Sequence, residues 1–228
     1  SKMLVSFAIV AYNEERSLPQ LLHDLENQDY PHNKIEVLLI DSMSKDSTKS
    51  IMEQFSETHS DFFRVVVLEN PEKTLPFGCN VALKNYSGDA IVRIDAHATI
   101  PNDFISKNVK ILQSGEKVSG GKRPNIIDEQ TPWKNMLLAA EQSMFGSSIA
   151  AYRNADKPRY VSSIFHGMYS REVYDTVGFY DTRLARTEDN DMSERISKAG
   201  YKLHYDPEIV SYQHTRSTLK GMLRQKYL

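Results

Sequence analysis

Four short apolar runs, separated by segments with helical periodicity, constrain the fold of the first half of the chain more than any other feature. The runs cover residues 4–10, 35–40, 63–68 and 90–94. The first is nearly continuous in apolar character, which is typical of a strand that is buried on both faces of a sheet. Strands that alternate with helices at this rhythm predict βαβ units, a parallel sheet and right-handed crossovers.

Helical periodicity between and after these runs completes the predicted architecture. Ser17, and then Asp46 or Ser47, are expected to cap the first two helices, and Pro76 lies near the start of a third. The composition shows no linker between the two halves, so we expect a single α/β domain over residues 1–228. Further helices are predicted at 102–113, 132–145, 170–178 and 188–199, and short strands at 118–121, around Leu203 and at 209–212.

Composition narrows the class of protein. The chain has 228 residues, of which 40% are hydrophobic, and its formal net charge is −2, so it lacks the broad basic field of nucleic-acid-binding proteins. Cys79 is its single cysteine, which rules out an internal disulfide and fits a reducing compartment. No apolar run reaches the roughly 18 residues of a membrane span, and the first run is too short for the core of a signal peptide. We therefore expect a cytoplasmic protein.

Acidic residues and a histidine follow the predicted strands at the points where the strands end. Asp95 and His97 come after the fourth apolar run, Asp41 directly after the second, and Glu14 shortly after the first. In open α/β sheets, ligands bind beyond the carboxyl ends of the strands. Carboxylate oxygens and an imidazole can together hold a divalent cation. Simpler explanations are a turn or helix cap for Asp41 and a polar turn for His97.

Five short motifs occur along the chain in a characteristic order and spacing. They are VAYNEE at 10–15, IDSMSKDST at 40–48, RIDAHA at 93–98, TEDNDMSERI at 187–196 and RQKY at 224–227. Together they resemble the family-two glycosyltransferases with the GT-A fold, and the resemblance covers essentially the whole chain. The DAHA form, with the segment 76–98 leading into it, looks most like the bacterial exopolysaccharide glucosyltransferases of the succinoglycan type. The implied fold is a Rossmann-like, mixed but mostly parallel sheet flanked by helices.

The resemblance implies that a sugar is transferred, with inversion, from a nucleotide diphosphate, usually UDP. The acceptor would be a saccharide or a lipid-linked saccharide in bacterial polysaccharide synthesis. A nucleotide-binding half would cover residues 1–100 and an acceptor-binding half residues 101–228. Asp189 would be the catalytic base, and Asp95 would face both the ribose and a divalent cation. The nucleotide would lie against Ala11, Tyr12, Glu14 and Asp41.

The implied metal site departs from the family's commoner Asp-any-Asp pattern, because His97 stands in place of the second aspartate. A divalent cation, Mn²⁺ or Mg²⁺, would neutralise the charge that develops on a diphosphate leaving group. Imidazole suits softer ions, so the histidine favours Mn²⁺ over Mg²⁺; it could instead donate to a phosphate oxygen. His214 is a further candidate by resemblance, since a late histidine completes the metal site in many GT-A enzymes. The alternative is an ordinary loop histidine.

Three more residues are candidates for substrate contacts. Lys73 follows the third predicted strand, where it could meet the base or a phosphate, although a solvated lysine is the alternative. Glu188 precedes the implied base and is a candidate acceptor contact. Two acids in the first turn of a helix are, however, also explained by the helix dipole. His166, just before Gly167, could line the acceptor side.

Two other classes of protein stay open. A nucleotidyltransferase could use a related scaffold, although it would be expected to carry a glycine-rich loop after the first strand, and residues 11–17 contain no glycine. The second is a non-catalytic subunit that binds a sugar nucleotide. Residues 217–228 form a basic amphipathic pattern, which leaves peripheral membrane contact at the inner face of the membrane open. This pattern stops without a cap, so we expect the natural chain to continue.

Overall fold

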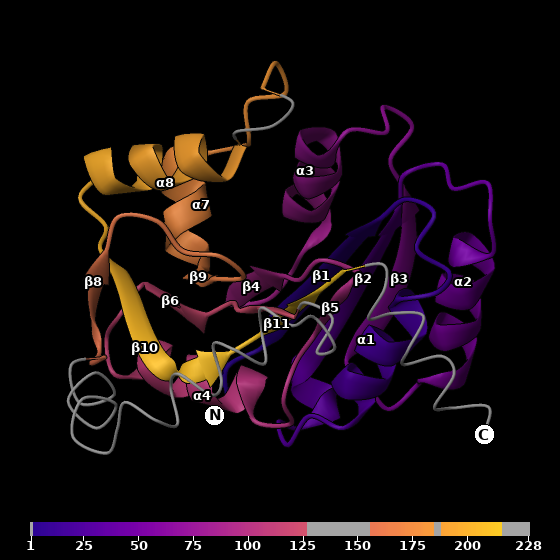
Figure 1. The fold of residues 1–228 in the computed structure, drawn as a ribbon, viewed down its shortest axis with the longest axis horizontal. Helices are drawn as coiled ribbons and strands as arrows, with labels where there is room; N and C mark the ends of the chain where they lie inside the picture. The colour runs from indigo at the N-terminus through magenta and orange to yellow at the C-terminus, as the bar shows by residue number, and fades with distance from the viewer. Residues whose placement is uncertain (1, 127–155, 185–187, 216–228) are drawn as a thin grey trace, which may run out of the picture.

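The computed structural model describes residues 2–126, 156–184 and 188–215, with residues 188–190 described by their backbone alone. Strands and helices alternate through the first half of the chain, and a less regular second half follows (Figure 1). The helices predicted at 132–145 and 217–228 lie outside the described residues. Within the described ranges, no helix combines the length and apolar character that crossing a bilayer requires.

Among the described residues, eight strands form one sheet in the order β3–β2–β1–β4–β9–β6–β10–β8. β1 to β4 run parallel, as predicted, and β9 joins antiparallel to both β4 and β6. The prediction of a mixed, mostly parallel α/β sheet is therefore confirmed. The strands are β1 (Val5–Ala11), β2 (Ile35–Asp41), β3 (Arg64–Glu69), β4 (Ala90–Arg93), β6 (Val118–Lys122), β8 (Arg159–Val161), β9 (Met168–Ser170) and β10 (Leu203–Val210).

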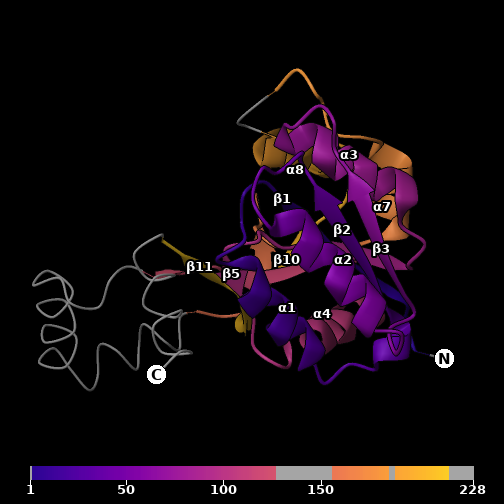
Figure 2. The same cartoon turned by 90° about the vertical axis from the view of Figure 1, so that its right-hand side faces the viewer.

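Helices cover both faces of this sheet, so that the domain has three layers (Figures 1 and 2). One layer contains α1 (Leu18–Glu26), α2 (Thr48–Thr58) and α4 (Phe104–Gln113). The other contains α3 (Leu75–Asn85), α7 (Arg171–Val177) and α8 (Glu188–Lys198). A short 3-10 helix, η1 (His32–Lys34), precedes β2.

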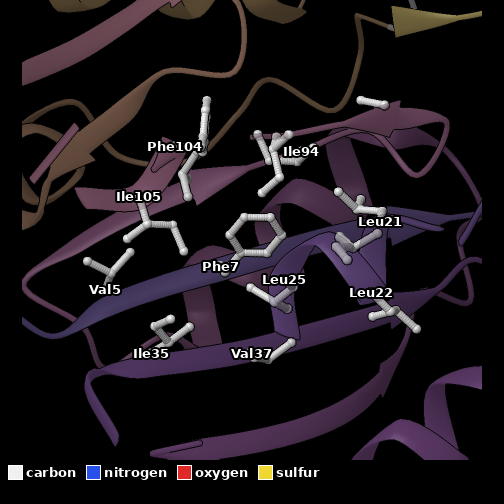
Figure 3. Close-up of a cluster of buried hydrophobic side chains, with 14 of the residues drawn as sticks. Val5, Phe7, Leu21, Leu22, Leu25, Ile35, Val37, Ile94, Phe104 and Ile105 are labelled. Carbon is white, nitrogen blue, oxygen red and sulfur yellow. The ribbon is translucent and has the colours of Figure 1, made fainter. Parts of the chain in front are cut away.

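Alternate side chains of β1 point to opposite faces and divide the core into two clusters. Phe7 and Ile9 pack in the cluster beneath α1, α2 and α4, whereas Ala8 belongs to the cluster beneath α3, α7 and α8. Figure 3 shows Phe7 among Leu25 of α1 and Ile105 of α4. Because helices cover both faces of β1, apolar and polar residues do not alternate along this strand. The sequence pattern indicates the same.

The predicted helix starts are confirmed to within a residue or two, but their caps differ. Ser17 precedes α1 without a side-chain capping bond; its hydroxyl donates instead to the Glu14 carboxylate, 2.6 Å away. At the start of α2, Asp46 Oδ1 accepts from the Thr48 N–H at 2.9 Å. The bond of Ser17 ties the segment after β1 to the start of α1, and the Glu15 N–H, which donates to Asp46 Oδ2 at 3.2 Å, ties the same segment to the start of α2.

A smaller sheet, missed by the sequence analysis, consists of β5 (Ala98–Thr99), β11 (Tyr212–His214) and β7 (Asn125–Ile126) in that order. The sequence predicts separate strands around Leu203 and at 209–212, but β10 is continuous and β11 begins only after Ser211. The chain changes sheets at Ser211, whose N–H donates to the Lys122 carbonyl at 2.9 Å. Strands of two or three residues are too short for their periodicity to be recognised.

The strand order places a topological switch point between β1 and β4. From β1 the chain moves outward to β2 and β3, and it then returns through α3 to the other side of β1 as β4. The segments after β1 and β4 therefore leave adjacent strand ends in different directions, which forms the crevice where open α/β sheets bind ligands. Ala11 pairs with Asp41 in the sheet, so the ends of β1 and β2 are level.

Replacing Phe7 with alanine is expected to lower the free energy of unfolding by about 3–5 kcal/mol, because the ring is fully buried. Phe63→Ala is the matched control: this ring is 53% exposed, and its loss should change the free energy by about 0.5 kcal/mol or less. Urea denaturation followed by circular dichroism measures both variants. Equal losses would contradict the assignment of Phe7 to the core.

Candidate functional site

Three carboxylates follow the parallel strands at the switch point. Asp41 is the last residue of β2 and is buried; both of its carboxylate oxygens lie 3.3 Å from the Ser44 N–H. Glu14 comes three residues after the end of β1, and Asp95 two residues after the end of β4. Tyr12 lies beside them with 48% of its surface exposed, so its ring is available to a ligand. The structure thus brings the predicted donor-site residues to one edge of the sheet.

Glu14 and His97 join the segments that follow β1 and β4. His97 Nδ1 lies 3.4 Å from Glu14 Oε1, and the Glu14 N–H donates to Thr48 Oγ1 at 2.8 Å. The bond to Glu14 raises the pKa of His97 above its ordinary value, although burial opposes this. Burial would raise the pKa of Glu14, but the bonds from His97 and Ser17 outweigh it and lower that pKa. This hydrogen-bonded pair lies across the switch point.

The other edge of His97 contacts β11. Its Nε2 accepts from the side-chain amide of Gln213, and its carbonyl accepts from the His214 N–H at 3.1 Å. His214 Nε2 lies 2.7 Å from Thr99 Oγ1, whereas His214 Nδ1 is buried without a hydrogen-bond partner. The small sheet therefore holds both candidate histidines close to the strand ends.

Asp95 is surrounded by cationic and donating groups. Arg93 Nη1 donates to its Oδ1 at 2.8 Å, His166 Nε2 lies 3.1 Å from its Oδ2, and Arg123 Nη1 lies 3.9 Å from Oδ2. Burial alone would raise the pKa of Asp95, but the charge of Arg93 and the bond from His166 hold it well below its usual range. Asp95 is therefore ionised at any physiological pH.

The described side chains at the strand ends offer only part of the ligand set of a divalent cation. Among the described residues, no three His, Cys, Asp or Glu side chains lie together as a preformed metal site. The ionised Asp95 carboxylate and the unpartnered, buried Nδ1 of His214 are nevertheless suitable ligand atoms. Cations that bind nucleotides typically take one or two carboxylates and complete their coordination with phosphate oxygens and water. The residues present fit a cation that is shared with a diphosphate.

Lys73 lies in the exposed segment between β3 and α3, beside the end of β2. Its N–H donates to the Asn70 carbonyl at 3.1 Å, and the Asn70 N–H donates to the Asp41 carbonyl at 2.8 Å. Lys73 has a φ of +68°, which is uncommon for a residue with a side chain. The turn therefore brings the lysine close to the region of Asp41.

Glu188 and Asp189 form the start of α8, as predicted, but their side chains lie outside what the structure describes. Further along the helix, Asp191 pairs with Arg195 at 3.3 Å, as expected of a residue on the helix surface. Arg195 also donates to the carbonyls of Val177 (2.8 Å) and Phe179 (2.6 Å). These bonds fix the position of α8 relative to the end of α7.

Asn80 connects this second half of the chain to the first half. Its Nδ2 donates to the Tyr180 carbonyl at 3.0 Å, and its Oδ1 accepts from the Tyr180 N–H at 2.8 Å. The side chain is largely buried on α3, and Tyr180 belongs to the segment that leads from α7 towards α8. Nothing in the local sequence around Asn80 indicates this connection, because Tyr180 is 100 positions away.

A cleft of about 700 Å³ opens next to Asp95 in the second half. Arg123 links the cleft to Asp95, because it lines the cleft and also faces Asp95. Its guanidinium stacks on the Phe165 ring, with 3.8 Å from its central carbon to the ring centroid. Among the described residues, the lining also includes Lys122, Asp156, Arg159 and Tyr205.

Sequence reasoning missed three residues around the strand ends, namely Arg123, Ser211 and Gln213. They come from short strands or from the segments between them, and their partners are distant in the sequence. The sequence carries no local signal for them. Arg93 did carry one, since it is a charged residue within an apolar strand that is only four residues long.

A mostly parallel sheet covered on both faces, with carboxylates beyond adjacent strands at its switch point, is the arrangement in which open α/β proteins bind a ligand at the strand ends. The model of the family described as "Glycosyl transferase family 2" matches residues 6–178. The chain belongs to this family, and it is a glycosyltransferase domain. The resemblance noted in the sequence motifs is thereby confirmed.

Relatives with assigned roles extend along nearly the whole chain. A Methanococcus voltae protein, named dolichyl N-acetyl-alpha-D-glucosaminyl phosphate 3-beta-D-2,3-diacetamido-2,3-dideoxy-beta-D-glucuronosyltransferase, is 27% identical over 227 residues, which are 97% of this chain and 70% of that protein. The succinoglycan biosynthesis protein ExoA of Rhizobium meliloti is 24% identical over 225 residues, 96% of this chain and 66% of that protein. Poly-beta-1,6-N-acetyl-D-glucosamine synthase of Staphylococcus epidermidis is 22% identical, and the chain spans 52% of it.

Solved structures share the fold. A mannosyltransferase of Pyrobaculum calidifontis in complex with GDP-Man and Mn²⁺ has a TM-score of 0.71 at 24% identity, over 93% of this chain and 57% of that one. S. aureus TarS 1-349 in complex with UDP-GlcNAc has a TM-score of 0.68 at 19% identity, over 94% of this chain and 59% of that one. The predicted GT-A fold is confirmed, and the solved structures include both a UDP-sugar and a GDP-sugar complex.

Asn80→Asp is expected to lower the free energy of unfolding by about 1–3 kcal/mol, because a carboxylate oxygen would replace the amide that donates to the Tyr180 carbonyl. Asn85→Asp introduces the same charge at the exposed end of the same helix and serves as the control, with a smaller expected loss. Thermal and urea unfolding of the two variants provide the comparison. An Asn80→Asp protein as stable as the Asn85→Asp protein would show that the bonds to Tyr180 contribute little.

Proposed function

We propose that this domain transfers a sugar, with inversion, from a nucleotide diphosphate, most simply a UDP-sugar, to a saccharide or lipid-linked saccharide in bacterial polysaccharide synthesis. The observation that carries the proposal is the convergence of Glu14, Asp41 and Asp95 beyond three adjacent parallel strands in a member of family 2. The name of the Methanococcus relative supports a lipid-linked acceptor, and that of the Rhizobium relative supports polysaccharide synthesis. The proposed location is cytoplasmic, with peripheral membrane contact.

In the proposed donor site, the backbone of Ala11 and the side chains of Tyr12 and Asp41 contact the base. A buried carboxylate such as Asp41 can accept from the imide N–H of uracil. Glu14 accepts from ribose hydroxyls or orients His97, with which it is paired. Lys73, on its exposed turn, reaches the base or a phosphate.

Asp95 faces the ribose and the diphosphate. Asp95, with His97 and His214, would hold Mn²⁺ or Mg²⁺, which supplies charge neutralisation to the diphosphate. Gln213 would have to release His97 Nε2 before that atom could bind a cation. Arg93 and Arg123, which already face Asp95, remain available to phosphate oxygens when the donor enters.

The proposed base is Asp189, in the first turn of α8. Its carboxylate takes the proton of the acceptor hydroxyl, whose oxygen attacks C1 of the sugar on the face opposite the diphosphate. The C1–O bond to the diphosphate breaks as the new C1–O bond forms. Glu188 beside it orients the acceptor.

Isothermal titration with UDP and with GDP, each in Mn²⁺ and in EDTA, tests the donor site. We expect UDP to bind in Mn²⁺, to bind much more weakly in EDTA, and to lose affinity in the Asp95→Ala variant, because a carboxylate that faces the diphosphate and its cation is removed. If the protein binds GDP and not UDP, the donor would be a GDP-sugar and the proposed mechanism would be unchanged. If wild-type protein binds neither nucleotide, the donor site at the switch point is wrong.

Asp189→Asn is expected to reduce sugar transfer by about 10²–10⁴-fold, the contribution typical of a general base, while nucleotide affinity stays within a few-fold of wild type. Asp191→Asn removes a carboxylate from the same helix and is the matched control, with transfer retained. Release of UDP from UDP-glucose and UDP-GlcNAc, measured with and without acceptor, reports the rate. Unchanged transfer by the Asp189→Asn variant would remove this residue from the mechanism, and release of pyrophosphate from a nucleoside triphosphate would favour a nucleotidyltransferase.

A further inference from the structure

Behind Asp95 lies a pair of side chains, His166 and Ser211, that the proposed mechanism does not use. Only 3% of the side-chain surface of His166 is exposed to solvent. Its Nδ1 lies 2.7 Å from Ser211 Oγ, and its Nε2 lies 3.1 Å from Asp95 Oδ2. Ser211 is also buried. The result is a buried chain of hydrogen bonds, Ser211–His166–Asp95, that ends at the carboxylate expected to face the donor.

The backbone of His166 has an unusual conformation. Its φ is +51°, in the left-handed region that residues with side chains seldom adopt. Gly167 follows it, and a Cβ there would lie 2.8 Å from the side chain of Ile164. The turn before β9 thus directs the imidazole inward to Asp95.

The contacts also decide which nitrogen carries the proton. An ionised carboxylate can only accept a hydrogen bond. Nε2 therefore carries a proton and donates to Asp95, and Nδ1 is left to pair with the Ser211 hydroxyl. The Asp95 N–H also approaches Nε2, but at 3.4 Å, and a bond to the charged acceptor is the stronger one.

We propose that His166, itself oriented by Ser211, is a positioning residue that fixes the Asp95 carboxylate for the nucleotide donor. Arg93 bonds the other oxygen of Asp95, so the two partners together define the plane of the carboxylate. Ser211 is too deeply buried to act as a nucleophile, which separates this arrangement from a hydrolytic triad. The role in donor binding rests on the proposed function.

Two substitutions of His166 separate positioning from folding. The amide of glutamine can reach the place of Nε2 and donate to Asp95, whereas the shorter asparagine reaches only the place of Nδ1, near Ser211. Asparagine, however, tolerates a positive φ better than glutamine does. A purely structural role therefore predicts that His166→Asn is the milder change, and a positioning role predicts that His166→Gln is.

We expect His166→Asn to bind UDP in Mn²⁺ about 10- to 100-fold more weakly than wild type, as is typical when a residue that orients a ligand is lost. His166→Gln should stay within a few-fold of wild type even if its melting temperature is lower. GDP replaces UDP as the probe if wild type prefers it. Equal affinities, or tighter binding by the asparagine variant, would overturn the proposal. Because wild-type protein would still bind the nucleotide, this result would not contradict the proposed donor site.

Ser211→Ala has a matched control in Ser119→Ala. Ser119 is a buried serine of β6, and its hydroxyl donates to Asn108 at 2.8 Å, away from Asp95. Both variants lose a buried hydrogen bond, so both should be less stable. Only Ser211→Ala should also bind the nucleotide more weakly. Equal weakening in the two variants would mean that general loosening of the core, and not the chain of bonds to Asp95, controls affinity.

The tautomer of the His166 ring tests its contact with Asp95 independently of nucleotide binding. The test therefore still applies if wild-type protein binds neither UDP nor GDP, a result that would refute the proposed function. Long-range ¹H–¹⁵N spectra of labelled full chain, assigned with His166→Gln, distinguish the two neutral tautomers. We expect His166 to be protonated at Nε2. A ring protonated at Nδ1 would be an acceptor at Nε2 and could not hold the Asp95 carboxylate, which would overturn the proposal directly.

Discussion

The negative charge of Asp95 is the constraint on which the site depends. A carboxylate that is largely withdrawn from water is stable as an ion only when cations and hydrogen-bond donors surround it. Asp95 receives these from Arg93 on its own strand, from His166 before β9, and from Arg123 after β6. Three segments that are distant in the sequence therefore have to meet at one carboxylate, and this fixes how the second half of the chain closes on the first.

At the opposite end of the sheet, a second buried carboxylate is stabilised by a different set of partners. Glu36, at the start of β2, is fully buried, and its carboxylate accepts from Ser6 Oγ and the Ser87 N–H at 2.8 Å and from Arg64 Nε at 3.0 Å. Ser6 and Arg64 lie on the neighbouring strands β1 and β3, Ser87 lies just before β4, and no ligand could reach the buried charge. The apolar core lies between these two carboxylates, one closed within the structure and the other directed to the crevice.

The first half of the fold could be predicted because its signals are local. Apolar runs identify β1 to β4, and parallel order alone brings the residues that follow them to one edge. The orientation of His166 could not be predicted, because it depends on Asp95, 71 positions earlier, and on Ser211, 45 positions later. The contact of Gln213 with His97 spans 116 positions and arises only once the small sheet has formed.

The two halves are also coupled at the helix that carries the proposed base. Arg195 ties α8 to the backbone at the end of α7, and Asn80 ties the next residues to α3 through Tyr180. Helix α3 in turn begins directly after the turn of Lys73, beside the proposed base-binding end of β2. The position of α8 relative to the crevice is therefore set by hydrogen bonds between the Arg195 and Asn80 side chains and backbone groups, which tolerate little change in length. Substitutions at the start of α8 can then change the proposed acceptor contacts while these bonds stay in place.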